Sequence, residues 1–406
     1  MAESVDVLVV GGGPAGAAAA VTGAGAGRSV LVCDKATFPR DKTCGDGLTT
    51  DALRRLEDLG LVPKDVDGFT PVRDVVVRSP SGRVVELPLP ADGLYAAVAP
   101  RATLDAALFD LAGRRGADRR ARAALEQLEV GPDRVRARLS DGTEVSAGHV
   151  VAADGVYSTV RKLLGDGNGD GGEGTRPYLG EWHAFRQYFT GVDDQRLWVF
   201  FEPDLLPGYA WVFPLGQGRA NVGFGLPRRP GVSVRPMAAV WRDLPQRAAL
   251  QEVLGDAVAE GTHRAWPIPA DLRRAPLSVG RVLFAGDAAG ATDPMTGEGI
   301  AQALATGTMA VEAILAGGGP EAVARRYAEA VEHHLGPDLR FAANLGKILR
   351  SPLGARAAVR AASLTDWTRR NFARWLFEDY PRALVLTPSR WRRGAMSAAG
   401  AYRPTD

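Results

Sequence analysis

The amino-acid sequence predicts an α/β fold in which a parallel sheet of Rossmann type is interrupted by a β-rich segment and followed by C-terminal helices. Three observations predict this arrangement. Residues 1–35 run strand, glycine-rich turn, alanine-rich helix and strand, which is the order of a βαβ unit. Strand-rich, aromatic sequence at 182–226 precedes a buried strand at 279–285 that leads into a second glycine-rich turn. Beyond Pro320 the apolar residues recur with helical spacing.

Between these landmarks, turn residues and periodicity predict the remaining elements. In order they are a helix over 51–59 that ends at Gly60, a hairpin of 75–78 with 83–87, and a hairpin of 134–139 with 143–145. Residues 165–175 are rich in glycine and aspartate, and we expect a mobile surface loop between domains there. We therefore predict a discontinuous nucleotide-binding domain (1–72, 95–165 and 276–330), a β-rich substrate domain (73–94 and 176–275) and a C-terminal helical region (331–406).

Composition excludes several classes of protein. The chain has 406 residues, 46% of them hydrophobic, and 49 basic against 47 acidic residues, so it can bury a large core and is not a dedicated nucleic-acid binder. Its two cysteines, Cys33 and Cys44, match neither a disulfide framework nor a zinc site, and we expect no metal and a reducing cytoplasm. A strand-like run begins at Val5, so we expect no export signal, and no segment predicts a transmembrane span.

The first glycine-rich turn, residues 11–16, has the pattern GxGxxG between a strand and a helix. Glycine there allows a tight turn, lets the backbone approach a pyrophosphate, and lets the helix pack closely on the strand. Asp34 ends the next strand, where a carboxylate can accept hydrogen bonds from a ribose. The predicted dinucleotide contacts are Gly11, Gly13, Pro14, Ala15, Gly16, Asp34 and its neighbour Lys35; this pattern alone allows either NAD or FAD.

Two later segments favour FAD. Residues 151–161 resemble the ADGxxSxxR segment of flavoprotein hydroxylases, and 283–300 resemble the GDAA segment and the glycine-rich helix start of the same superfamily. Asp287 at a strand end can accept hydrogen bonds from ribityl hydroxyls, and a helix starting near Gly297 points its amides at the isoalloxazine. The resemblance implies a glutathione-reductase-like FAD domain with contacts from Arg101, Asp154, Gly286, Asp287, Pro294, Gly297, Gly299 and Ile300.

Within that superfamily, residues 38–49 and 206–214 resemble the geranylgeranyl reductase family, and especially its bacterial menaquinone-reductase-like members. The resemblance extends over residues 1–315. It implies FAD, reduction of isoprenoid carbon–carbon double bonds, and an external electron donor such as NAD(P)H without a separate nicotinamide domain. It also implies that Cys44 and Gly45 lie near the flavin. Cys44 either shapes the site or relays a proton, and an unreactive loop cysteine is the alternative.

Aromatic side chains predict the substrate pocket. Tyr209, Trp211 and Phe213 alternate along one strand, as do Trp198 and Phe200 along another, so each strand presents a face of aromatic rings. Such faces suit an apolar small-molecule substrate above a flavin, although ordinary sheet core accounts for them equally well. Residues 372–377 and 390–393 interleave aromatics with arginines, and here we favour packing over peripheral membrane contact.

The leading hypothesis is an FAD-dependent reductase of an apolar isoprenoid or natural-product double bond. A monooxygenase that hydroxylates or epoxidises a polyketide or terpenoid is the enzyme alternative, because it would share every FAD motif. A flavin-binding redox sensor without catalysis is the alternative from another class, and it predicts no enclosed substrate cavity.

Overall fold

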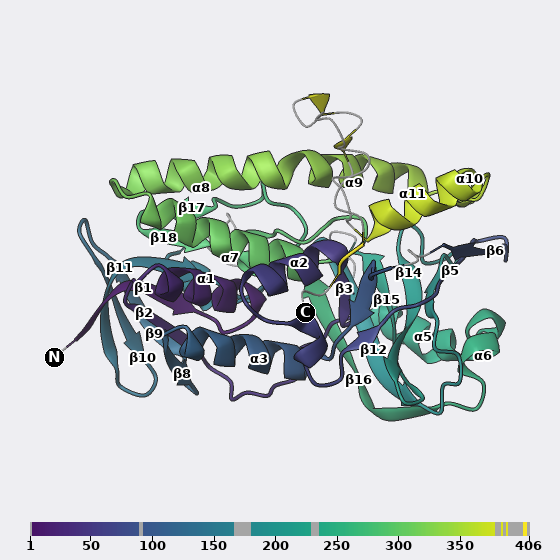
Figure 1. Ribbon diagram of the computed structural model, residues 1–406, viewed down its shortest axis with the longest axis horizontal. Helices are drawn as coiled ribbons and strands as arrows, with labels where there is room; N and C mark the ends of the chain where they lie inside the picture. Colours follow the sequence, from purple (N-terminus) through teal and green to yellow (C-terminus); the bar gives the residue numbers. More distant parts are fainter. Residues whose placement is uncertain are drawn as a thin grey trace.

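The computed structural model describes residues 2–88, 92–165, 180–228, 235–377, 383–384, 387–388 and 401–403. Figure 1 shows one sheet beneath the helices labelled α7 (Ile300–Leu315) and α8 (Pro320–His334) on the side of the N-terminus, and a second sheet on the opposite side of the molecule. Most of the predicted loop at 165–175 and all of 390–393 lie outside the described residues. The α/β fold with an added β-rich region is confirmed.

The first sheet has the parallel core that the sequence predicts. Its order is β17-β18-β11-β1-β2-β8, with β1 parallel to both β2 and β11, and β9 and β10 extend it through β11. Val7 to Val10 of β1 are buried on both faces, as expected of a central parallel strand. The bounds are β1 Glu3–Val10, β2 Val30–Asp34, β8 Asp118–Ala121, β9 Leu125–Val130, β10 Val135–Leu139, β11 Glu144–Ala152, β17 Ser278–Val279 and β18 Val282–Phe284.

Small residues let two helices approach closely beside this sheet. Helix α1 (Pro14–Gly25) has four fully buried alanines, Ala17 to Ala20, and it packs on α7 (Ile300–Leu315). A Cβ added to Gly307 of α7 would lie 2.0 Å from the carbonyl oxygen of Ala15. The alanine-rich composition of α1 therefore reflects close helix packing. The neighbouring helices are α2 (Thr50–Asp58), α3 (Arg101–Arg114), α4 (Thr159–Leu163) and the short 3-10 helices η1 (Pro63–Asp65) and η3 (Gly286–Ala289).

The second sheet has the order β16-β12-β15-β14-β13-β5-β6, and the predicted hairpin at 75–87 forms its edge. Its bounds are β5 Val75–Arg78, β6 Val84–Leu87, β12 Trp182–Thr190, β13 Leu197–Phe200, β14 Tyr209–Gly216, β15 Arg219–Pro227 and β16 Val258–Ile268. One face packs on α5 (Arg235–Asp243), η2 (Leu244–Gln246) and α6 (Ala248–Leu254). The strands β3 (Gly47–Thr49), β4 (Thr70–Pro71) and β7 (Ala96–Val98) form a small third sheet. The domain limits stay a prediction.

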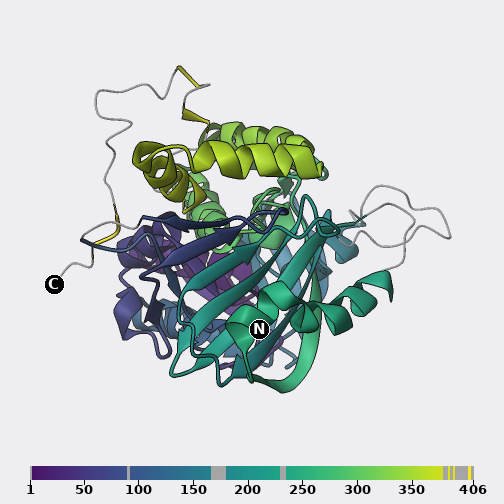
Figure 2. The ribbon, with the colours of Figure 1, turned by 90° about the vertical axis from the view of Figure 1, so that its right-hand side faces the viewer.

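The C-terminal helices form an outer layer. They are α8 (Pro320–His334), α9 (Gly336–Leu349), α10 (Pro352–Ala362) and α11 (Asp366–Leu376), and Figure 2 shows the last three across the top of the second sheet. Phe372 and Phe377 pack inward with residues of β5 and β13, so residues 372–377 pack as expected. No helix within the described ranges is long and apolar enough to cross a bilayer.

Candidate FAD and substrate site

A cavity of about 410 Å³ opens where the carboxyl ends of β1, β2, β11 and β18 face the second sheet. This edge of a parallel sheet is where α/β proteins bind ligands. The predicted cofactor contacts that line it are Gly11, Gly13, Pro14, Ala15, Asp34, Lys35, Cys44, Gly45, Arg101, Asp154, Gly286, Asp287, Gly297, Gly299 and Ile300. Gly16 and Pro294 are not among the lining residues. Residues from distant parts of the chain therefore meet at one site.

The glycine loop has space for an anion. Helix α1 begins at Pro14, and its N-cap residue Gly13 makes no side-chain capping bond, so the first amides of the helix are open to a ligand. A Cβ on Gly13 would meet only the Arg40 guanidinium, at 3.5 Å. A Cβ on Gly16 would lie 1.8 Å from the carbonyl oxygen of Gly11, so Gly16 serves the packing of helix on strand. Asp34 accepts hydrogen bonds from the backbone amide of Gly12 at 2.8 Å, which fixes the loop.

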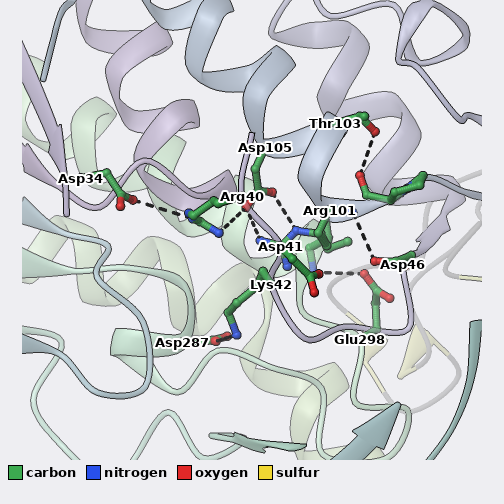
Figure 3. Close-up of polar contacts among 12 residues, drawn as sticks. Asp34, Arg40, Asp41, Lys42, Asp46, Arg101, Thr103, Asp105, Asp287 and Glu298 are labelled. Carbon is green, nitrogen blue, oxygen red and sulfur yellow. Dashed lines mark hydrogen bonds and ion pairs between the residues drawn. The ribbon is translucent and has the colours of Figure 1, made fainter. Parts of the chain in front are cut away.

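A chain of charged side chains runs along the same wall (Figure 3). Arg40 lies 3.7 Å from Asp34 and 3.1 Å from Asp105, and Arg101 donates two hydrogen bonds to Asp105 at 2.7 and 2.8 Å. Burial lowers the pKa of Arg101, but the neighbouring Asp105 and Cys44 raise it by more. The pKa of Arg101 is therefore above its usual value. Arg101 therefore stays charged, and the guanidinium groups of Arg40 and Arg101 both lie where they can bind anionic groups of a cofactor. Arg40 is not among the site residues predicted from the sequence.

The ADGxxSxxR and GDAA segments are physically connected. Arg161 donates to the carbonyl oxygens of Ala288 at 2.8 Å and Pro276 at 2.9 Å, and its guanidinium carbon lies 3.7 Å from the centroid of the Phe284 ring. The hydroxyl of Thr306 on α7 accepts a hydrogen bond from the amide of Gly286 at 2.9 Å. These contacts hold the turn after β18, and they leave the carboxylate of Asp287 at the cavity wall.

Lys42 and Trp266 complete this wall, and the sequence analysis did not identify either as a site residue. The Lys42 ammonium lies 3.9 Å from a carboxylate oxygen of Asp287 and 4.3 Å from the centroid of the Trp266 ring. Burial lowers the pKa of Lys42 to about 8, although Asp287 opposes this shift. Lys42 belongs to the loop that the family resemblance had assigned to the site, but Trp266 lies near the C-terminal end of β16, a mostly exposed strand without a motif.

We predict that FAD affinity falls as Lys42 loses its charge. Because its pKa in the folded protein lies near 8, below the 10.5 usual for a lysine, raising the pH through 8 neutralises this cation in the folded protein first. The apoprotein should therefore gain stability between about pH 8 and 10.5, while binding of the anionic cofactor weakens. Fluorescence titration with FAD from pH 7 to 9.5 measures this, with Lys162→Met, an exposed lysine, as control. Equal pH dependence in wild type and Lys42→Met would contradict it.

The loop around Cys44 reaches across to the second sheet. The carboxylate of Asp46 accepts hydrogen bonds from the Tyr188 hydroxyl and the Asn221 side-chain amide, both at 2.8 Å, and Asn221 also donates to the carbonyl oxygen of Cys44 at 2.8 Å. Trp211 donates to Asn221 at 3.1 Å. Burial raises the pKa of Asp46 to about 6 despite these bonds. The network fixes the turn that carries Cys44, and sequence reasoning missed Asp46, Tyr188 and Asn221.

Cys44 itself lies in the cavity wall with its proton retained. Burial raises the pKa of the thiol, and the Arg101 charge, which lowers it, does not reverse the shift. A thiol of this kind stays protonated and is not a thiolate nucleophile at neutral pH.

The aromatic residues divide between two faces of the second sheet. Tyr209, Trp211 and Phe213 of β14 line the cavity, and the Tyr209 hydroxyl donates to the carbonyl oxygen of Thr296. Trp198 and Phe200 of β13 do not line the cavity, which corrects the prediction that they belong to the substrate pocket. They stand opposite Val212 and Ala210 in the β13–β14 register, so they share the other face and pack into the core on the α5–α6 side. Alternation predicts that residues share a face but not which face meets the ligand.

A second cavity of about 140 Å³ adjoins the first, and the two share Tyr209, Phe213, Met295, Thr296, Glu298 and Gly47. Apart from Thr49, the rest of its lining consists of apolar side chains and alanines. They come from the second and small sheets and from the inner faces of α9, α10 and α11, and include Val77, Val199, Leu349, Ala358, Phe372 and Trp375. The first cavity, whose wall carries charged side chains among apolar ones, therefore continues into an almost entirely apolar one beneath the C-terminal helices.

Comparison with known proteins agrees with this geometry. The family model described as FAD binding domain matches residues 4–328, and the chain belongs to this family. It is 35% identical over 342 residues to a menaquinone reductase of Mycobacterium tuberculosis, and the match covers 76% of each chain. It is 32% identical over 371 residues to digeranylgeranylglycerophospholipid reductase 2 of Methanopyrus kandleri, and that match covers 84% of this chain and 86% of the relative. A geranylgeranyl bacteriochlorophyll reductase-like structure from Thermoplasma acidophilum aligns with a TM-score of 0.76 at 22% identity, over 95% of this chain and 99% of that one.

The resemblance to the geranylgeranyl reductase family is thus confirmed, and the protein is an FAD-dependent oxidoreductase of that type. The residues present fit FAD: the open amides above Gly13, the cations Arg40 and Arg101, and the carboxylates Asp34 and Asp287 all reach the same cavity. Bound FAD supplies two-electron transfer to or from a substrate. The role of each lining residue stays a prediction.

Proposed function

We propose that this enzyme saturates a carbon–carbon double bond of an isoprenoid lipid or a similarly apolar natural product. The observation that carries the proposal is the pair of adjoining cavities, because the first, with charged side chains in its wall, suits a flavin and the second, lined almost entirely by apolar side chains, suits a hydrocarbon chain. Two relatives are named for menaquinone and for a digeranylgeranyl lipid, and both compounds carry isoprenoid chains. A double bond would then react near Tyr209 and Phe213, where the cavities meet.

In this proposal the residues at the junction position the substrate and supply a proton. Cys44 retains its proton at neutral pH and lies in the cavity wall, so its Sγ–H is our candidate for the donor. Asn221 donates to the backbone carbonyl of Cys44, the backbone amide of Arg101 donates to the Asp46 carboxylate, and the Arg101 side chain bonds to the Cys44 thiol, so this loop is held in place. We propose an external reductant, NAD(P)H or a reduced carrier protein, and a cytoplasmic location.

One anaerobic experiment separates the proposal from its alternatives. Reduced holoenzyme is incubated with candidate isoprenoid lipids, and the products are analysed by mass spectrometry. A gain of two hydrogens supports the reductase, whereas a gain of one oxygen on re-aeration would establish the monooxygenase. If no lipid reoxidised the flavin or shifted its absorbance, the flavin-binding sensor would stand in its place.

We predict that Ala358→Trp shortens the accepted substrate. Ala358 lines the apolar cavity from α10, and an indole there would fill space that several methylene groups of a long chain occupy. Each displaced methylene costs about 0.8 kcal/mol, so KM for a long-chain substrate should rise roughly tenfold or more. The kcat for a short-chain substrate with the same double bond should not change, because the junction is untouched.

The matched control is Ala357→Trp, which places the same side chain on the exposed face of the same helix. Both variants are assayed in detergent solution with long and short substrates. Equal KM values for the long substrate in the two variants would show that the apolar cavity does not hold the chain.

A further inference from the structure

The outward surface of α9 to α11 carries an unusual set of exposed apolar side chains. Ile348, Leu353, Leu364 and Trp367 are 59%, 78%, 68% and 62% exposed. Elsewhere in the described ranges, the exposed large hydrophobic side chains are Val84, Tyr157, Leu163 and Val258, which belong to separate elements. We call residues 347–370 the outer face; half of the exposed large hydrophobic residues gather there.

The charge of the outer face is as uneven as its hydrophobicity. Lys347, Arg350, Arg356, Arg360 and Arg370 are exposed on it, and Asp366 is its single exposed acidic residue. The whole chain is nearly balanced, with 49 basic and 47 acidic residues, so this excess is local. Exposed large apolar side chains between cations are the composition of a surface that inserts shallowly into anionic lipid.

Helix α10 shows how the outer face relates to the substrate cavity. Ala358 and Val359 on its inner face line the apolar cavity, whereas Leu353, Arg356 and Arg360 on its other face are exposed. One layer of helices therefore separates the cavity from the outer face. Figures 1 and 2 both show α10 and α11 at the periphery of the molecule.

We propose that the outer face docks on an anionic lipid bilayer, so that the apolar cavity lies one helix away from the membrane that holds the substrate. Single large side chains from three consecutive elements, separated by arginines, suit a fluid lipid surface, and no groove shaped for a peptide ligand is needed. The proposal reverses the preference for packing derived from the sequence, and it uses other residues, because 372–377 face inward. Its physiological purpose rests on the proposed function, but the docking itself does not.

The test is co-sedimentation of FAD-loaded protein with vesicles of phosphatidylcholine, with and without phosphatidylglycerol, at low and high salt. We expect the wild type to bind the anionic vesicles and to be released by salt. Arg356→Ala with Arg360→Ala should weaken binding roughly tenfold or more, since each basic residue near an anionic surface strengthens binding about fivefold. Leu353→Ser with Trp367→Ser should weaken binding at both salt concentrations.

The controls carry the same chemistry away from the outer face. Val258→Ser removes an equally exposed hydrophobic side chain on β16, and Arg136→Ala removes an exposed arginine on β10. No binding by the wild type at low salt, or equal losses in the controls, would overturn the proposal, as would binding of an acidic protein partner in place of vesicles. All variants should keep wild-type turnover of a detergent-dispersed substrate, so a failure of the proposed function would leave the vesicle result interpretable.

Discussion

Gly16→Ala should destroy the fold, whereas Gly13→Val should leave a folded protein that no longer binds FAD. A Cβ on Gly16 would lie 1.8 Å from the backbone oxygen of Gly11, and neither the helix nor the loop can yield that much. We expect a loss of more than about 3 kcal/mol, because overpacking against backbone exceeds ordinary core strain. A side chain on Gly13 would meet only the flexible end of Arg40, so it would fill space meant for a pyrophosphate.

Gly25→Ala is the matched control, because nothing lies within 4 Å of a Cβ added there in the same helix. Thermal unfolding of the apoproteins and the absorbance of bound flavin after purification separate the two effects. A folded Gly16→Ala protein would show that the loop can move away from α1. Normal flavin content in Gly13→Val would show that the phosphates of the cofactor lie elsewhere.

Asp287→Ala should lose FAD while keeping its stability. The carboxylate lies at the cavity wall, where its recorded polar contacts are the Thr292 hydroxyl at 3.4 Å and Lys42 at 3.9 Å, so little of the fold depends on it. Charge-assisted hydrogen bonds to ribityl hydroxyls would contribute roughly 1.5–3 kcal/mol, so the Kd of FAD should rise about ten- to a hundredfold. Asp287→Asn should recover part of this affinity, since an amide oxygen still accepts.

Titration of apoprotein with FAD measures these constants, and Asp271→Ala, outside the cavity lining, controls for the loss of a loop carboxylate. An unchanged Kd in Asp287→Ala would remove this residue from the cofactor site. A large drop in the melting temperature of the apoprotein would instead indicate that Asp287 supports the turn after β18.

Short-range patterns predicted the cofactor side of the site. The glycine loop, Asp34 and the turn at 286–300 each occupy a few consecutive residues whose backbone geometry follows from glycine content and strand ends. The structure brings them to one cavity because the carboxyl ends of parallel strands share one edge of a sheet. Proximity of these motifs was therefore implied once the parallel sheet was predicted.

The substrate side depended on contacts between residues far apart in the chain. Asp46 meets Tyr188 and Asn221 across 142 and 175 residues, and no local pattern links a loop carboxylate to a tyrosine in a strand of another sheet. The error at Trp198 and Phe200 has the same origin. Alternation assigned each strand two faces, but the pairing of β13 with β14 and the packing of α5 and α6 decided which face is core.

The sequence by itself determined the class of fold, the cofactor and the family, because strand periodicity, glycine turns and motif order are local properties of the chain. Only the tertiary structure decided that Lys42 lies over Trp266, that Cys44 keeps its proton, and that an apolar cavity extends beneath α9 to α11. The pKa of a buried group depends on desolvation and on charges brought near it by folding. The shape of a cavity likewise depends on which helix faces meet which sheet. The inner faces of α9 to α11 line the apolar cavity, and this packing decides which side chains are left exposed on the outer face.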